Sequence, residues 1–285
     1  MKTDPNLKSL LSLMDDPDSM IRDAVQKRLF DMGEEAFGEM ERLMPEFSDR
    51  IDPDYYLSYI NNLRREYVFS KLNEYNSNPD PLLIDGLLLV SQALEPSLDR
   101  QFYKDSIQEM SDEMLLELSD NRTAIENLEI FNYIFFRRFG FKHVDESVTH
   151  VENALITKVI DSKRGNIFTI PLCYFLLARH TGLPVYPLIV AKSFTPAYID
   201  NDDNILFYIN IYKEGIIFSD DQLRKNLPAN EGGDPFKFAR IGTDKALVSI
   251  YAEHLSYLYG AVKDNESQKV MQRVMECFGD ERFIN

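Results

Sequence analysis

An apolar run near the middle of the chain limits the possible folds more than any other feature. Residues 167–178 are all apolar except for Thr169. A run of this length is too short to cross a bilayer but is enough for about three turns of buried helix. Pro171 suits a first helical turn, and the Gly-Leu-Pro sequence at 182–184 is typical of a helix end. The sequence therefore predicts a central buried helix, followed at once by a buried strand, Val185–Val190.

The chain before this run predicts only helices. Apolar residues recur at helical spacing over residues 7–43, and the sequence Asp-Asp-Pro-Asp at 15–18 supplies an N-cap carboxylate and a first-turn proline. This arrangement resembles a HEAT-type helical hairpin over residues 6–44, which cannot bury its apolar face alone. Further on, Thr123 and Glu126 have the spacing of a capping box at the start of another helix.

Short β-rich runs follow the central helix, separated by polar turn sequences. The runs are Val185–Val190, Ala197–Ile199, Ile205–Ile211 and Ile216–Phe218. Short strands separated by polar turn sequences predict antiparallel hairpins. A sheet with one apolar face needs a helix to cover that face. Two final helices are expected over 244–262 and 267–278.

The predicted fold class is therefore α+β and mostly helical. A helical N-terminal region precedes a core in which the central helix packs on a small antiparallel sheet, and a C-terminal helical hairpin completes the chain. We expect three parts: a HEAT-like region at 1–78, the core with its helical lead-in at 79–228, and the C-terminal hairpin at 229–285.

Composition limits the possible partners. The 285 residues carry a formal net charge of −16, which disfavours nucleic-acid and membrane partners because both attract basic surfaces. The two cysteines cannot form a disulfide framework, and no signal peptide precedes the first helix, so we expect a cytoplasmic protein. The four histidines have no ligand spacing and no Gly-rich phosphate loop is present, so no metal and no cofactor is expected.

The order of helix, Gly-Leu-Pro, strand and hairpin resembles the core of the transglutaminase-like superfamily, which has a papain-like α+β arrangement. More narrowly, it is similar to the bacterial SirB-type branch. The first family motif begins Arg164-Gly165-Asn166 here, and the second is intact as Gly182-Leu183-Pro184-Val185. Ser193-Phe194 stands where the branch has His-Phe, and Ile209-Asn210 stands where it has Ile-Asp. The resemblance covers about residues 80–225.

The same resemblance implies that the catalytic activity of the superfamily enzymes is lost in this chain. Enzymes of the superfamily need a thiolate at the head of the central helix, an imidazole and a carboxylate. These positions correspond to Ile167, Ser193 and Asn210, so none of the three groups is present. Removing the nucleophile of a triad can alone reduce turnover on the order of 10⁶-fold. The resemblance therefore implies a pseudoenzyme.

Three hypotheses of function follow. In the first, the former active-site cleft binds a protein, a peptide or a small ligand, and its lining includes Asn166, Thr169, Phe194 and Tyr212. In the second, an amide-transfer, acyl-transfer or peptidase enzyme uses a relocated nucleophile, Cys173 or Thr169, although Cys173 is expected to be buried and Thr169 to cap the helix.

In the third, the chain is an interaction scaffold whose tyrosine-rich helices, 55–67 or 251–259, form the contact surface.

Overall fold

The computed structural model of the protein describes residues 5–144, 150–190, 193–226 and 240–279. The α-helices are α1 (Pro5–Leu11), α2 (Ser19–Met32), α3 (Glu34–Phe47), α4 (Pro53–Ser77), α5 (Leu83–Leu94), α6 (Arg100–Leu115), α7 (Ala124–Asn132), α8 (Ile156–Ser162), α9 (Thr169–His180), α10 (Asp220–Asn226), α11 (Asp244–Ala261) and α12 (Asn265–Cys277). The strands are β1 (Lys142–His143), β2 (Arg164–Gly165), β3 (Val185–Val190), β4 (Ser193–Ile199), β5 (Ile205–Asn210), β6 (Ile216–Phe218) and β7 (Arg240–Ile241). A π-helix, η1 (Tyr133–Arg138), continues α7, and η2 (Val151–Ala154) and η3 (Ile211–Lys213) are 3-10 turns.

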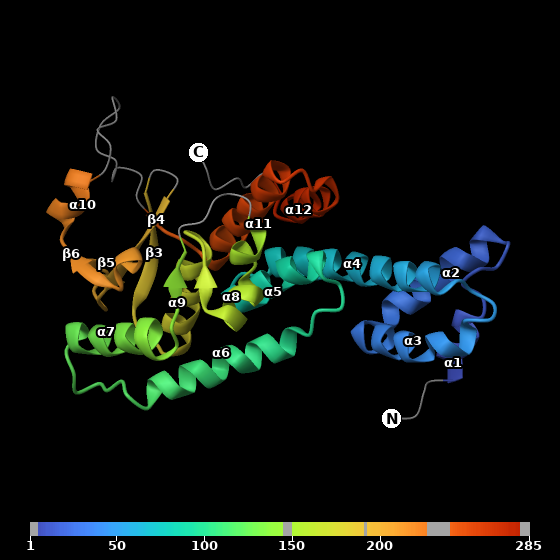
Figure 1. The fold of residues 1–285 in the computed structure, drawn as a ribbon, viewed down its shortest axis with the longest axis horizontal. Coiled ribbons are helices and arrows are strands. Elements are labelled where there is room, and N and C mark those ends of the chain that lie inside the picture. The colour runs from blue at the N-terminus through green and yellow to red at the C-terminus, as the bar shows by residue number, and fades with distance from the viewer. Residues whose placement is uncertain (1–4, 145–149, 191–192, 227–239, 280–285) are drawn as a thin grey trace.

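The N-terminal helices form one end of an elongated molecule, and α4 runs from that end into the main body (Figure 1). Helices α1 to α3 and the first half of α4 bury an apolar cluster of their own, which includes Leu29, Phe37 and Ile60. The N-cap carboxylate predicted within residues 15–18 is Asp18, which accepts a hydrogen bond from a backbone amide of the first turn of α2. The first-turn proline expected there is wrong, because Pro17 precedes the cap and lies outside the helix. Asp52 caps α4 in the same way. The long helix α4 therefore contributes to both hydrophobic clusters, since its second half belongs to the main core.

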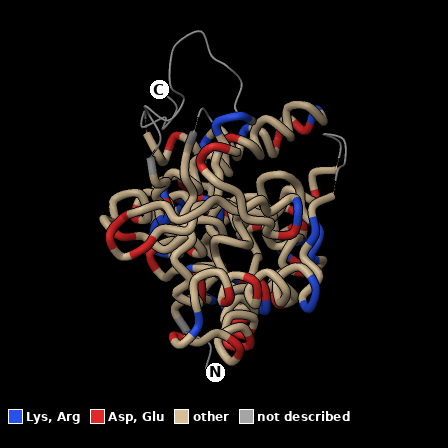
Figure 2. Tube along the Cα trace, turned by 90° about the vertical axis from the view of Figure 1, so that its left-hand side faces the viewer, with Lys and Arg blue, Asp and Glu red and all other residues tan. Residues whose placement is uncertain are grey.

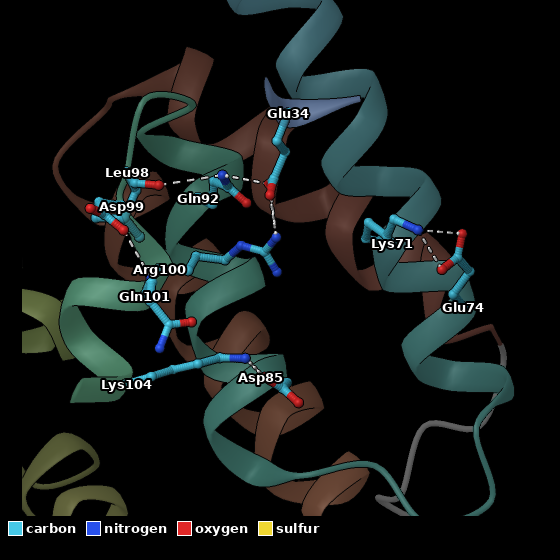
Figure 3. A network of polar contacts seen from close by, with 10 residues as sticks. All are labelled: Glu34, Lys71, Glu74, Asp85, Gln92, Leu98, Asp99, Arg100, Gln101 and Lys104. Carbon is cyan, nitrogen blue, oxygen red and sulfur yellow. Dashed lines mark hydrogen bonds and ion pairs between the residues drawn. The ribbon is translucent and has the colours of Figure 1, made fainter. Parts of the chain in front are cut away.

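Polar contacts also connect the N-terminal helices to the main body (Figure 3). The Glu34 carboxylate, at the start of α3, accepts hydrogen bonds from the Gln92 amide at 3.1 Å and from the Arg100 guanidinium at 2.8 Å. One carboxylate thus joins α3 to both α5 and α6. An ion pair between Lys104 and Asp85 connects α6 to α5 beside it.

Helix α9 is the centre of the main core, as the sequence predicts. Every residue from Thr169 to Ala178 is buried, and the surrounding apolar side chains come from helices on all sides and from the sheet. The helix begins at Thr169, so Ile167 lies in the turn before it. The capping box predicted at Thr123 and Glu126 is also present at the start of α7.

The predicted antiparallel meander is confirmed in β3 to β6, and β7, which was not predicted, adds a fifth strand beside β3, so that the order is β6-β5-β4-β3-β7. Strand β4 begins at Ser193, earlier than the expected Ala197, because it pairs with β3 along its whole length, from Val190 opposite Ser193 to Val185 opposite Tyr198. One face of the sheet packs on α9 through residues such as Ile209. The other face forms a small cluster with α10.

The C-terminal helices α11 and α12 pack on each other and on α5, and their apolar residues belong to the main core. Among the described residues, no helix is both long enough and apolar enough to cross a membrane. Asp and Glu residues are spread over the whole trace rather than gathered in one region (Figure 2).

Candidate functional site at the head of helix α9

The side chain of Asn166 caps the central helix. Its Oδ1 atom accepts hydrogen bonds from the backbone amides of Phe168 at 2.8 Å and Thr169 at 3.0 Å. The Thr169 hydroxyl accepts from the Asn166 amide at 3.0 Å and donates to the Asn153 carbonyl at 2.7 Å. The expectation that Thr169 caps the helix is therefore corrected: Thr169 lies inside the first turn, and the residue whose side chain reaches the free amides is Asn166.

Gly165 allows this close arrangement. A Cβ atom at this position would lie 2.7 Å from the Thr169 hydroxyl and 2.9 Å from Val159. Both neighbours are buried, so neither can move aside easily. The glycine therefore keeps the backbone of β2 against the head of α9.

A histidine from α11 completes the head of the helix. The Asn166 Nδ2 atom lies 2.9 Å from the His254 Nε2 atom. Because Oδ1 of Asn166 already accepts from two amides, we assign Nδ2 as the donor and His254 Nε2 as the acceptor, which places the imidazole proton on Nδ1. The His254 ring also stacks on Phe168 at a centroid distance of 4.0 Å. Burial lowers the pKa of His254 to about 4, so at neutral pH it is an uncharged imidazole with its Nε2 lone pair occupied.

The three positions that the family resemblance assigns to a catalytic triad differ in their surroundings. Ile167 is 52% exposed at the head of α9. Asn210 lies at the end of β5, where its side chain accepts a hydrogen bond from the Lys213 backbone amide at 3.1 Å. This bond stabilises the turn that follows β5. The backbone of Ser193 begins β4, opposite Val190; its side chain lies outside the described set.

The four residues expected to line the cleft all lie around the first turn of α9. Asn166 and Thr169 are bonded to each other, as described above. The Phe194 ring packs edge-on against Phe168 at 6.0 Å and Phe175 at 5.9 Å, from the strand β4. The Tyr212 hydroxyl donates to the carbonyl oxygen of Ile167 at 2.9 Å.

Tyr212 and Ile167 form the exposed part of this region. The Tyr212 side chain is 48% exposed, and its ring meets His143 of β1 edge-on at 5.3 Å. The half-exposed side chains of Ile167 and Tyr212 give this region an apolar and aromatic surface, next to a phenol oxygen. Such a surface can bind a partner by contact and hydrogen bonding.

Neither relocated nucleophile is accessible. Cys173 is completely buried, and burial raises the pKa of its thiol to about 12, so the thiol is protonated at neutral pH. Thr169 is completely buried as well, and its hydroxyl proton is directed to the Asn153 carbonyl. Within the described ranges, no group of three or more His, Cys, Asp or Glu side chains is placed to hold a metal ion.

His254 is the member of this region that sequence reasoning missed. It lies 88 positions after Asn166 and has no motif around it, so it appeared only as one of four unpaired histidines. Its contact with Asn166 depends on how α11 crosses the core. No pattern in the sequence around His254 could therefore have predicted its place at the head of α9.

Replacing Asn166 with alanine is expected to lower the free energy of unfolding by about 1–2 kcal/mol, because the two amides at the head of α9 lose their acceptor. Asn166→Ser keeps a capping oxygen while removing the same Nδ2 donor to His254 that alanine removes, so it should cost less. Urea unfolding at neutral pH measures both. Equal losses in the two variants would show that the cap is not the source of the effect.

Comparison with known families agrees with the observed arrangement of helix and sheet. A family profile described as the transglutaminase-like superfamily matches residues 101–246, a span that runs from the start of α6 to the first turn of α11 and includes α9 and the sheet. Comparisons with curated proteins and with solved structures each found no match. The matched residues make up just over half of the chain. The chain therefore belongs to the transglutaminase-like superfamily.

Proposed function

We propose that the transglutaminase-like domain of this chain is non-catalytic and binds a protein segment, a peptide or a small ligand at the head of α9. The observation that carries the proposal is the exposed pair of Ile167 and Tyr212 at the head of α9. The family resemblance assigns Ile167 to the position of the nucleophile in the superfamily enzymes. Sites rather than folds define function, and this site offers contact surface in place of reactive groups.

The substituted triad supports a binding role over catalysis. An aliphatic side chain at 167 cannot attack a carbonyl carbon, and an amide at 210 cannot orient an imidazole as a carboxylate does. The imidazole of His254, which lies beside Asn166 and Phe168, already accepts a hydrogen bond from Asn166. We also assign the chain to the SirB-type branch, on the motifs at 164–166 and 182–185.

The enzyme hypothesis has less support. It needs Cys173 or Thr169 as a nucleophile, and both side chains are fully buried. An enzyme of that type would have to open the core around α9 before its first chemical step.

Selection of random peptides on the full chain tests the proposal. Peptides selected on the wild-type protein are expected to lose roughly tenfold in affinity for an Ile167→Asp variant, because a charge replaces an exposed apolar side chain of the surface. Leu116→Asp is the matched control: Leu116 is 86% exposed just after α6 and is not part of the head of α9.

Two outcomes would contradict the proposal. Selected peptides that bind the Ile167→Asp variant as tightly as the wild type would place the binding surface elsewhere. Incorporation of an amine into a glutaminyl peptide, or hydrolysis of that peptide, by the wild-type chain would show catalysis.

A further inference from the structure

A second surface is a groove between β6 and the α7–η1 helix. The groove has a volume of about 460 Å³. Ile125 and Tyr133 line it from the helix, and Ile216 and Ile217 line it from the strand. A second depression of about 400 Å³ adjoins it, and Tyr133 lines both. The exposed side chain of Tyr133 therefore separates two hollows, the groove and the second depression.

One asparagine, Asn132, connects the two sides of the groove. The Asn132 Nδ2 atom donates to the Gly215 carbonyl at 3.1 Å, and its Oδ1 atom accepts from the buried Tyr174 hydroxyl at 2.6 Å. Gly215 has a φ angle of +82°, and a Cβ atom there would lie 2.2 Å from Asn132. The contact between helix and hairpin is therefore set by the fold, and the groove exists before any partner arrives.

The groove runs along the open edge of the sheet. Among the described strands, β6 pairs with β5 on one side only. Ile216 and Ile217 both line the groove, although neighbouring side chains on a strand point to opposite faces. The groove therefore runs beside β6, which is the last strand of the sheet order on this side. An open edge presents unpaired backbone amides and carbonyls, which an extended segment can pair with.

The side chains at this edge are apolar and exposed. Ile216 is 60% exposed and Ile217 is 39% exposed, and β6 contains neither a lysine nor a proline to block a further strand. Tyr133 is 62% exposed and Ile125 is 45% exposed on the facing helix. An added strand could place every second side chain between these residues.

One carboxylate specifies the charge of the partner. Glu129 lines both hollows, and its carboxylate forms no ion pair with another described residue. Of the arginines that line the two hollows, Arg137 pairs with Glu214, Arg138 pairs with Glu113 and Glu117, and Arg122 donates a hydrogen bond to the backbone carbonyl of Glu117. A carboxylate one helical turn from an exposed aromatic side chain, with both lining the same hollows, favours a lysine or arginine side chain, by ion pairing and by cation–π attraction.

We propose that the groove binds an extended peptide segment of a partner protein, which adds as a strand to the edge of β6. Alternate apolar side chains of the segment fill the space between Ile216, Ile217 and Ile125. A lysine or arginine of the segment lies between Glu129 and Tyr133. This surface is separate from the head of α9 and does not depend on the function proposed for that site.

A synthetic peptide tests the proposal on the full chain. The probe is a fluorescent acetylated nonapeptide amide in which valine alternates with threonine and lysine. Glu129→Gln is expected to weaken its binding roughly 2- to 5-fold, as for an exposed ion pair. Tyr133→Ala should weaken it on the order of tenfold, because ring contact and cation–π attraction are lost together. Glu109→Gln, which removes the same charge from an exposed position on α6, should leave the affinity unchanged.

Control peptides separate strand addition from simple charge attraction. A peptide with glutamate in place of lysine should bind more weakly, and so should one with N-methylated alternate residues, which cannot pair with the strand edge. The proposal is overturned if the lysine peptide shows no binding at concentrations up to about 1 mM. It is overturned as well if Glu109→Gln weakens binding as much as Glu129→Gln does, or if the N-methylated peptide binds as tightly as the lysine peptide. It is also overturned if Ile167→Asp abolishes binding while Glu129→Gln and Tyr133→Ala leave it intact, since the peptide then occupies the head of α9.

Discussion

Replacing Tyr174 with alanine is expected to lower the free energy of unfolding by about 4 kcal/mol, the loss typical of a buried aromatic side chain. Tyr174 is completely buried in the middle of α9. Its ring meets Phe131 and Phe135 edge-on, at centroid distances of 4.9 Å and 5.0 Å. Alanine would leave a cavity among these rigid rings, which belong to another helix and cannot close over it fully. Urea unfolding at neutral pH measures the loss.

The hydroxyl of Tyr174 should account for a smaller share of this effect. It donates to Asn132 at 2.6 Å, and Asn132 in turn holds the Gly215 carbonyl at the tip of the hairpin. Tyr174→Phe keeps the ring and is expected to cost about 1–2 kcal/mol, because a buried amide oxygen loses its donor.

Tyr257→Ala is the control for the tyrosine itself. Tyr257 is 66% exposed on α11, so its loss should change stability by less than about 0.5 kcal/mol. Equal losses for Tyr174→Ala and Tyr257→Ala would mean that α9 is not the centre of the core.

Acidification is expected to destabilise the protein through His254, by up to about 3 kcal/mol. Burial lowers the pKa of this imidazole from 6.5 to about 4. The unfolded chain therefore takes up a proton at a higher pH than the folded chain does. The contribution of His254 to stability is fully present above pH 6.5 and falls as the pH is lowered toward about 4, where the folded state is protonated too.

A glutamine at this position provides the comparison. The amide side chain of a His254→Gln variant has no charge at any pH and can still accept a hydrogen bond from Asn166. We expect the wild type to lose more stability than this variant between about pH 7 and about pH 4.5, with the carboxylates contributing equally to both. Urea unfolding at the two pH values gives the difference. If both proteins lose the same amount, His254 is not the group responsible.

The secondary structure could largely be predicted from the sequence because its signals are local. The apolar run at 167–178 and the Gly-Leu-Pro at 182–184 marked α9 and its end, and the strand Val185–Val190 has the bounds that were expected. The capping box at Thr123 and Glu126 depends on residues three positions apart and is present. The early start of β4 was missed because it depends on pairing with β3, which is a contact between strands.

The candidate site could be predicted only in part. Asn166, Phe194 and Tyr212 were expected near the head of α9 through a family resemblance, and they lie there. What each side chain does was less predictable, since Asn166 caps the helix and Thr169 does not. That difference depends on where the helix begins, which is decided by hydrogen bonds over a few residues rather than by composition.

By itself, the sequence determined that this chain would build a mostly helical core around one apolar helix, because apolar spacing is a property of the chain read in order. The assignment of Ile167, Ser193 and Asn210 to triad positions depends on a family resemblance and stays a prediction. Only the tertiary structure decided that His254 of α11 meets Asn166, that Tyr212 joins Ile167 at an exposed surface, and that β6 leaves an open edge beside Glu129 and Tyr133. These depend on how helices cross and strands order, which is set by burial summed over the whole core and leaves no local pattern at the residues concerned.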